Sequence, residues 1–369
     1  MVVFLATAHG KNIGGKCSPT FPKEGSKEQW VQFREWKWSR KICFMLKYLL
    51  LEYYKYNEDF DCLVDVIQDY EMNSNDSQKS GVNQRININK QHQLKNKASK
   101  NEDFGCIMLT IHVNAAGNAK KWVDSKGWGM WLHGDAYTGE DGKTHRKESA
   151  STRDIDRELC SFFYHTKDVV NTKTTYNLNG TCGNKKNSKR YSLGGYGILR
   201  NALCPAAMSE NFLQDNYDDV KFLRSAEGEK AVLTIHLNAI VAFLKKYGYE
   251  RKTNFNPTKT PKCDLYNAPN PYHKDLVGNN YLKYPIIFDF KNENKNNLYQ
   301  QDFNVHLFNK QYNEIYKVII PKGEEESLYN SRDTASPKEL VFEKMPILTN
   351  NELQNIINKS NTDKTNNFK

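Results

Sequence analysis

The chain has 369 residues, of which 38% are hydrophobic and 12% aromatic, so it can bury one sizeable core and leave room for a smaller second domain. No stretch approaches the ~20 apolar residues of a membrane span, which excludes a transmembrane protein, and the eight cysteines form no CxxC pair, which favours synthesis in a reducing compartment. The formal net charge of +10 favours anionic partners: nucleic acid, an anionic membrane surface or an acidic wall polymer.

The first part of the chain alternates between apolar runs of strand length and amphipathic stretches. The apolar segment 2–8 has no basic region before it, so we interpret it as a strand and not as an export signal. Ser26 and Gln29 resemble a capping box that starts a long helix. In chain order, the predicted elements are a strand at 2–8, a helix ending near 56, a strand at 62–67, a helix at 84–97 and a strand at 107–111.

The same alternation continues to about residue 247. A Gly- and Trp-rich strand at 127–133 precedes an amphipathic helix at 149–165, and a basic loop at 172–195 precedes an apolar run that ends at Glu210. A closing helix is predicted at 227–247. Strands that alternate with helices predict an α/β fold, with a mixed twisted sheet flanked by helices on both faces.

A change of composition near residue 252 predicts a domain boundary. Beyond it the chain is rich in asparagine, and short strands are predicted at 284–290, 302–308 and 316–320. The predicted division is therefore a catalytic domain at 1–250, a small C-terminal β-containing appendage at 251–356 and a disordered tail at 357–369. Wall binding or docking is one hypothesis for the appendage.

Three of the apolar strand segments run directly into a residue that can carry chemistry. They end at His9, at His112 and at Glu210, and site residues in α/β folds usually lie where strands emerge from the sheet. Taken alone, a histidine at a strand end is more often a structural residue. His133 also ends an apolar strand and is the best rival ligand.

Four short motifs, in this order along the chain, carry a family resemblance. They are Ala8-His9-Gly10, the segment 34–40 with Glu35, Thr-Ile-His-Val-Asn-Ala at 110–115, and Pro-Ala-Ala-Met-Ser-Glu at 205–210, preceded by Ile-Leu-Arg at 198–200. Over residues 1–245 the chain thereby resembles the zinc-dependent N-acetylmuramoyl-L-alanine amidases of the Amidase_3 type, the cell-wall amidases of bacteria and phages. It departs from their pattern at Ser39, where the family usually has asparagine.

The resemblance implies a zinc site. His9, Glu35 and His112 would bind one zinc ion per chain, and Glu210 would act as the catalytic general base. A catalytic zinc commonly has three His or Glu ligands and keeps a fourth position for water, so this set of residues suits the chemistry.

The resemblance also implies the reaction, which is hydrolysis of the amide bond between N-acetylmuramic acid and L-alanine in peptidoglycan. Asn114 is expected to orient His112 or to contact the substrate, and Arg200 is expected to have a similar supporting role. Nucleic acid is not expected as a partner, because the basic residues are dispersed and accompany no reading motif.

Two alternatives stay open at this point. One is a zinc peptidase that cuts within the stem peptide, and the other is a non-catalytic virion or binding protein with a degenerate amidase fold. The lack of an export signal and the Asn/Lys-rich composition favour a phage lysin, made in the host cytoplasm and acting on the wall after release, or carried on the virion.

Overall fold

The computed structural model describes most of the first 251 residues and the last helix. The described ranges are 1–9, 14–22, 30–54, 57, 60–64, 105–117, 120–180, 190–251 and 346–366, together with short strands at 262–263, 286–289, 303–308, 314–320 and 340–341. The helix predicted at 84–97, Gly10 and most of the lysines of the predicted basic loop lie outside the described residues.

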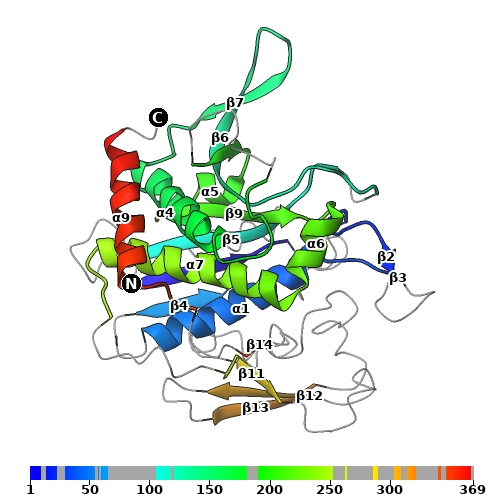
Figure 1. Ribbon diagram of the computed structural model, residues 1–369, viewed down its shortest axis with the longest axis vertical. Coiled ribbons are helices and arrows are strands. Elements are labelled where there is room, and N and C mark those ends of the chain that lie inside the picture. The colour runs from blue at the N-terminus through cyan, green and yellow to red at the C-terminus, as the bar shows by residue number, and fades with distance from the viewer. Residues whose placement is uncertain are drawn as a thin grey trace.

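A seven-stranded mixed sheet forms the centre of the described chain (Figure 1). Four of its strands run parallel in the order β4, β1, β5 and β9, and β6 then pairs antiparallel with β9. β7 continues β6 as an antiparallel hairpin, and β8 pairs parallel with β6. The strands are β1 (Val2–Thr7), β4 (Asp61–Val64), β5 (Cys106–Asn114), β6 (Gly129–Thr138), β7 (Thr144–Glu148), β8 (Ser192–Gly194) and β9 (Ala206–Leu213).

The central strands are buried on both faces. Every residue of β1 and every residue of β9 is buried, and in β5 only His112 and Asn114 are partly exposed. Parallel strands that are covered on both faces read as continuous apolar runs, which is why the sequence reveals β1 and β5 so clearly. Among these three strands, only the C-terminal end of β5 reaches solvent.

Three long helices cover one face of the sheet. α1 (Glu35–Tyr53) packs on β1, β4 and β5, α4 (Asp154–Asn171) packs on β6 and β9, and α7 (Ala226–Lys246) lies between the two helices. The buried ion pair Lys41–Glu229, at 2.5 Å, joins α1 to α7. The short helix α6 (Tyr217–Leu223) links β9 to α7.

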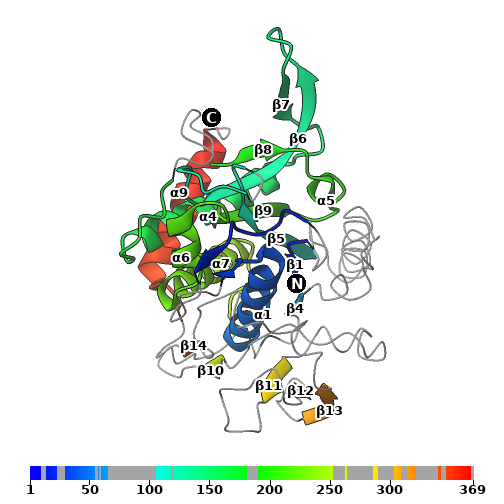
Figure 2. The same ribbon diagram turned by 90° about the vertical axis from the view of Figure 1, so that its right-hand side faces the viewer.

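The other face of the sheet carries α5 (Gly197–Arg200), which contacts β6 and β9 (Figure 2). Successive side chains of a strand point to opposite faces. Ser209 of β9 bonds to His236 of α7, so its neighbours Met208 and Glu210 point away from the long helices, toward α5.

The C-terminal segment forms a packed helix, so the prediction of a disordered tail from residue 357 is wrong. α9 (Asn350–Thr365) begins with a capping box between Thr349 and Glu352 and lies on α4 and α7 (Figure 1). Leu353, Ile356 and Ile357 are buried at helical spacing. These three apolar residues stand among polar ones, which is why composition alone pointed to disorder.

The predicted α/β class and the mixed sheet with helices packed on it are confirmed. Of the strands predicted in the appendage, β11 (Ile286–Asp289), β12 (Phe303–Phe308) and β13 (Glu314–Ile320) form an antiparallel sheet. That this segment is a separate domain stays a prediction. No helix of the described chain is long and apolar enough to cross a membrane.

Candidate metal centre

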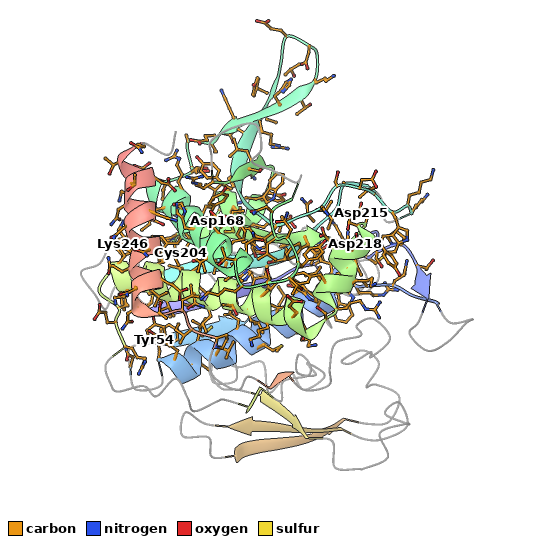
Figure 3. All side chains as sticks on the ribbon, viewed as in Figure 1. Tyr54, Asp168, Cys204, Asp215, Asp218 and Lys246 are labelled. Carbon is orange, nitrogen blue, oxygen red and sulfur yellow. The ribbon has the colours of Figure 1, made fainter. Side chains whose placement is uncertain are left out.

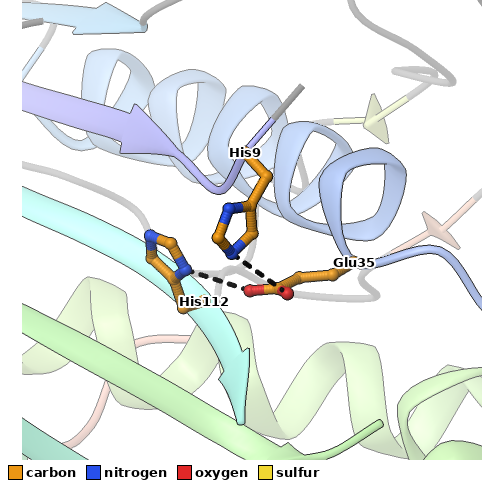
Figure 4. Close-up of side chains that lie close together, drawn as sticks. All are labelled: His9, Glu35 and His112. Carbon is orange, nitrogen blue, oxygen red and sulfur yellow. Dashed lines mark hydrogen bonds and ion pairs between the residues drawn. The ribbon is translucent and has the colours of Figure 1, made fainter. Parts of the chain in front are cut away.

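Three side chains from three different elements meet at the end of the parallel strands. His9 follows β1, Glu35 is the first residue of α1 and His112 belongs to β5. His9 Nε2 lies 3.3 Å from Glu35 Oε2, and His112 Nδ1 lies 3.0 Å from Glu35 Oε1 (Figure 4). One possible ligand atom from each residue lies within 4.8 Å of the others, so the three could hold a metal ion.

The backbone turns sharply to present His9. His9 has a φ of +45°, in the left-handed region that few residues other than glycine occupy. This turn ends β1 and directs the imidazole toward Glu35, and the ring of His9 meets that of His112 edge to face at a centroid distance of 4.9 Å. Backbone strain of this kind persists where the surrounding structure enforces it, and it is concentrated at functional sites.

Glu35 is held as a carboxylate in a fully buried position. Its Oε1 accepts hydrogen bonds from the Val113 backbone N–H at 3.0 Å and contacts His112 Nδ1. Burial alone would raise the pKa of Glu35, but the adjacent His9 and His112 outweigh burial and hold this pKa well below its usual range. The site is therefore built around a charged carboxylate.

Ser39 connects the elements that carry the three side chains. Its hydroxyl donates to the Ile111 carbonyl at 2.6 Å and accepts from the Ala8 N–H at 2.9 Å. Both bonds are buried, and their backbone partners, Ile111 and Ala8, directly precede His112 and His9. The serine that stands in place of the expected asparagine thus fixes α1 against the ends of β1 and β5.

The donor set fits a zinc ion. Two imidazoles and a carboxylate are a common ligand set for catalytic zinc. The donor atoms of the three residues lie within 4.8 Å of one another, and Glu35 lies 3.0 and 3.3 Å from the two rings, so a single ion could contact all three. His9, Glu35 and His112 are 5%, 1% and 12% exposed, so a bound ion would be shielded yet reachable.

Glu210 lies beside the three residues on the neighbouring strand. It pairs with His112 across β5 and β9 and is buried, and its Oε2 has no hydrogen-bond partner among the described residues. Burial, and secondly the charge of Glu35, raise its pKa well above the usual range. Glu210 is inside β9 and not at the strand end as predicted, because β9 continues to Leu213.

A pocket of about 500 Å³ opens above these residues. Met208 and Ile198 contribute apolar surface, and Thr110, Asn114 and Tyr196 contribute polar groups; the remaining wall includes His9, Lys16, Glu35, His112 and Glu210. The pocket therefore contains every predicted site residue except one.

Arg200 is the predicted site residue that does not line the pocket. It is exposed at the end of α5, and its supporting role stays a prediction. Asn114 does line the pocket, and its Oδ1 accepts from the Ala115 N–H at 2.8 Å. The rival histidine, His133, pairs with Asp135 at 3.3 Å and does not belong to the candidate metal group.

A buried hydrogen-bond chain supports the strands behind the site. The Asn211 amide donates to the His112 carbonyl at 2.9 Å and to Ser209 Oγ at 3.0 Å, and its oxygen accepts from Trp128 Nε1. Ser209 Oγ in turn lies 2.8 Å from Nε2 of His236. The sequence predicts a structural or surface role for His236, and its role here is structural. The role of Asn211 was not predicted, although a polar residue beside Glu210 in an apolar strand is a signal of such a chain.

Lys16 and Tyr196 were also missed as pocket residues. Lys16 follows two glycines in a loop, and Tyr196 lies between two glycines, so neither shows a periodic pattern. Only the long-range pairing of β6, β8 and β9 brings Tyr196 to the pocket.

Comparisons with known proteins give structural matches only. No protein-family model and no curated protein matches the sequence. The structure is similar to N-acetylmuramoyl-L-alanine amidases of low sequence identity: one from Clostridium difficile 630 (12% identity, 66% of this chain and 96% of that chain, TM-score 0.39), the catalytic domain of CwlV from Bacillus (Paenibacillus) polymyxa (13%, 66% and 98%, 0.39) and AmiC2 of Nostoc punctiforme (13%, 66% and 97%, 0.39). The chemistry of the site has to be inferred from its own residues.

Proposed function

We propose that the chain is a zinc-dependent amidase that hydrolyses the bond between N-acetylmuramic acid and L-alanine in peptidoglycan. One observation carries the proposal: four residues singled out by four separate sequence motifs converge on one pocket. His9, Glu35, His112 and Glu210 are separated by up to 201 positions in the chain, so their convergence depends on the fold and not on proximity in the sequence.

His9, Glu35 and His112 would hold the zinc ion. When bound there, zinc would act as a Lewis acid on the amide carbonyl and would activate water as the nucleophile. The residues supply the conditions for this chemistry: Glu35 provides a negative charge that balances part of the charge of the ion, and the two imidazoles provide nitrogen donors.

Glu210 would act as the general acid and base. Its carboxylate would accept a proton as water attacks the amide carbonyl, and it would then donate that proton to the leaving amine of L-alanine. Its position on the strand next to His112 and its partner-free Oε2, within the described residues, leave an oxygen available for this transfer.

The test combines metal content with product analysis. The purified protein should contain one zinc per chain, and digestion of purified peptidoglycan should release peptides that begin with free L-alanine while leaving intact muramic acid on the glycan. Glu35→Ala should lose zinc and activity together, whereas Glu250→Ala, a change of an exposed glutamate outside the pocket, should lose neither.

The other outcomes correspond to the alternatives. New amino termini inside the stem peptide would indicate a peptidase, and a protein without stoichiometric zinc would indicate a binding role. Delivery by a phage, by holin-dependent release or on a virion, remains a prediction from composition.

A further inference from the structure

Lys16 is held at the edge of the pocket by its chain neighbours on both sides. The Lys16 carbonyl accepts from the Glu35 N–H at 3.2 Å, and Cys17 forms a bridge with Arg34. On the other side, the Gly15 carbonyl accepts from Gln214 Nε2 at 3.4 Å. The backbone of Lys16 is therefore fixed to the start of α1 and to the segment after β9.

The ammonium group of Lys16 is available to a ligand. Lys16 is half-buried and lines the same pocket as Glu210, and it forms no ion pair with a carboxylate of the described residues. Its charge lowers the pKa of Glu210 against the larger raising effects of burial and Glu35, and both residues line the same pocket. Apart from the two histidines of the metal centre, Lys16 is the one basic residue of the described pocket wall.

The chemistry of the substrate limits what this cation can bind. In the proposed reaction the lactyl carboxyl group of muramic acid is itself the acyl part of the scissile amide, so it carries no charge. The sugar and its N-acetyl group are neutral as well. A negative charge close to the scissile bond must then come from the peptide, from the residue that follows L-alanine.

We propose that Lys16 binds a carboxylate on the peptide side of the scissile amide and makes the enzyme selective for stem peptides with a free acid at that residue. This inference rests on the proposed amidase function. An ammonium on a flexible stem suits a single carboxylate, and the partly buried position strengthens the ion pair relative to one in open solvent.

The experiment uses two synthetic muramoyl peptides that differ at one group. In both, L-alanine is followed by a glutamate-type residue, which carries either a free carboxylate or a carboxamide, and the C-terminus is amidated. The wild-type protein should show a kcat/KM about 10- to 100-fold higher for the acid than for the amide, the range given by one charge-assisted hydrogen bond. Lys16→Met also removes a charge near Glu210, which would affect both peptides alike, so the readout is the ratio: the preference should be abolished because hydrolysis of the acid falls about 10- to 100-fold further than that of the amide.

Two variants make the test specific. Lys16→Arg keeps the positive charge and should retain part of the preference. Lys230→Met removes an exposed lysine of α7 that does not line the pocket, and it should behave as the wild type. An equal loss on both peptides in Lys16→Met would overturn the proposal, because Lys16 would then act on Glu210 or on the reacting amide.

A binding measurement distinguishes a failure of this inference from a failure of the proposed function. If the wild-type protein cleaves neither peptide, the amidase function fails, and calorimetric titration of the Glu210→Gln protein with both peptides then decides about Lys16. Tighter binding of the acid, lost in a protein that also carries Lys16→Met, would support the carboxylate site. Equal binding of both peptides would overturn it.

Discussion

Glu210 and the three proposed ligands have different tasks, and one substitution separates them. Glu210→Gln keeps the size of the side chain and leaves His9, Glu35 and His112 in place, so the protein should fold and hold zinc. Turnover should fall by roughly 10²- to 10⁴-fold, the usual contribution of general acid–base catalysis. Metal analysis and hydrolysis of a soluble muropeptide measure the two properties. Near wild-type turnover would mean that another carboxylate is the base.

Ser39 is the residue that transmits the position of α1 to both histidines. Ser39→Ala removes the bonds to Ile111 and Ala8, and we expect the zinc affinity to fall by about 10- to 100-fold, as for other groups that orient metal ligands. Competition with a chelator measures this affinity. Thr234→Ala, which removes a hydroxyl bonded only to Lys230 within α7, is the matched control. Unchanged affinity in Ser39→Ala would show that packing alone orients the ligands.

At the scale of elements, the contact between α7 and β9 should make stability depend on pH. Burial lowers the pKa of His236 to about 4. In the neutral ring of His236, Nδ1 donates to the Val232 carbonyl, and Nε2 therefore accepts from the Ser209 hydroxyl. An unfolded histidine titrates near 6.5. Between pH 6.5 and 4 the unfolded state therefore binds more protons, and stability should fall as the pH falls, by about 3 kcal/mol over the window.

Urea unfolding at several pH values tests this contribution. His236→Gln can still accept from Ser209 but does not titrate, so its stability should depend less steeply on pH between 6.5 and 4. His145→Gln, at an exposed position paired with Asp141, should keep the wild-type slope. Identical slopes in all three proteins would assign the acid sensitivity to other groups.

The sequence predicts best those elements that are largely buried. β1 is apolar along its length, and β5 and α7 are apolar over most of theirs, so their predicted bounds lie within a few residues of the observed ones. β9 was placed too short, because polar Asn211 interrupts the pattern although it is buried and hydrogen-bonded to its neighbours. α9 was missed because its packing depends on partners in α4 and α7 that local patterns do not reveal.

The residues of the site likewise divide into those marked by a local sequence pattern and those that depend on distant contacts. His9, His112 and Glu210 adjoin apolar strands and belong to recognisable motifs, whereas Glu35 was assigned from its motif alone, with no apolar strand to mark it. Lys16 is brought to the pocket by a bond from the Glu35 N–H to its own carbonyl and by a bond from the Gln214 side chain to the carbonyl of Gly15, both from residues more than a dozen positions away in the chain. Such contacts are a property of the fold and leave no local pattern.

At the scale of the whole molecule, α9 is a segment far along the chain that packs on α4 and α7. Asp363 of α9 accepts from Ser161 and pairs with His165 and Arg190, and Glu158 of α4 binds both Lys246 and Lys364. Figure 3 labels Lys246 close to α9. The Asn238 side chain bonds to the Pro346 carbonyl and the Leu348 N–H. Residues 252–345 are therefore inserted between two parts of one packed unit.

Replacement of this insert and a core mutation in α9 should have different effects on stability. A protein in which about 12 Gly/Ser residues, with a mean span of roughly 20 Å, replace 252–345 should fold and bind zinc. Ile356→Ala in α9 should lower the free energy of unfolding by about 2–5 kcal/mol, as expected for a buried isoleucine. Thermal unfolding and metal analysis measure both. Loss of folding on removal of the insert would mean that it forms part of the core.

The contact between Asn238 and Pro346 spans 108 positions, and this separation has a consequence for the kinetics of folding. The entropic cost of closing a loop grows only with the logarithm of its length. Halving the insert should therefore make the docking of α9 more favourable by about 0.6 kcal/mol. Contacts of such large sequence separation slow folding. We therefore expect α9 to dock in a late refolding phase, and that phase should become faster as the insert is shortened.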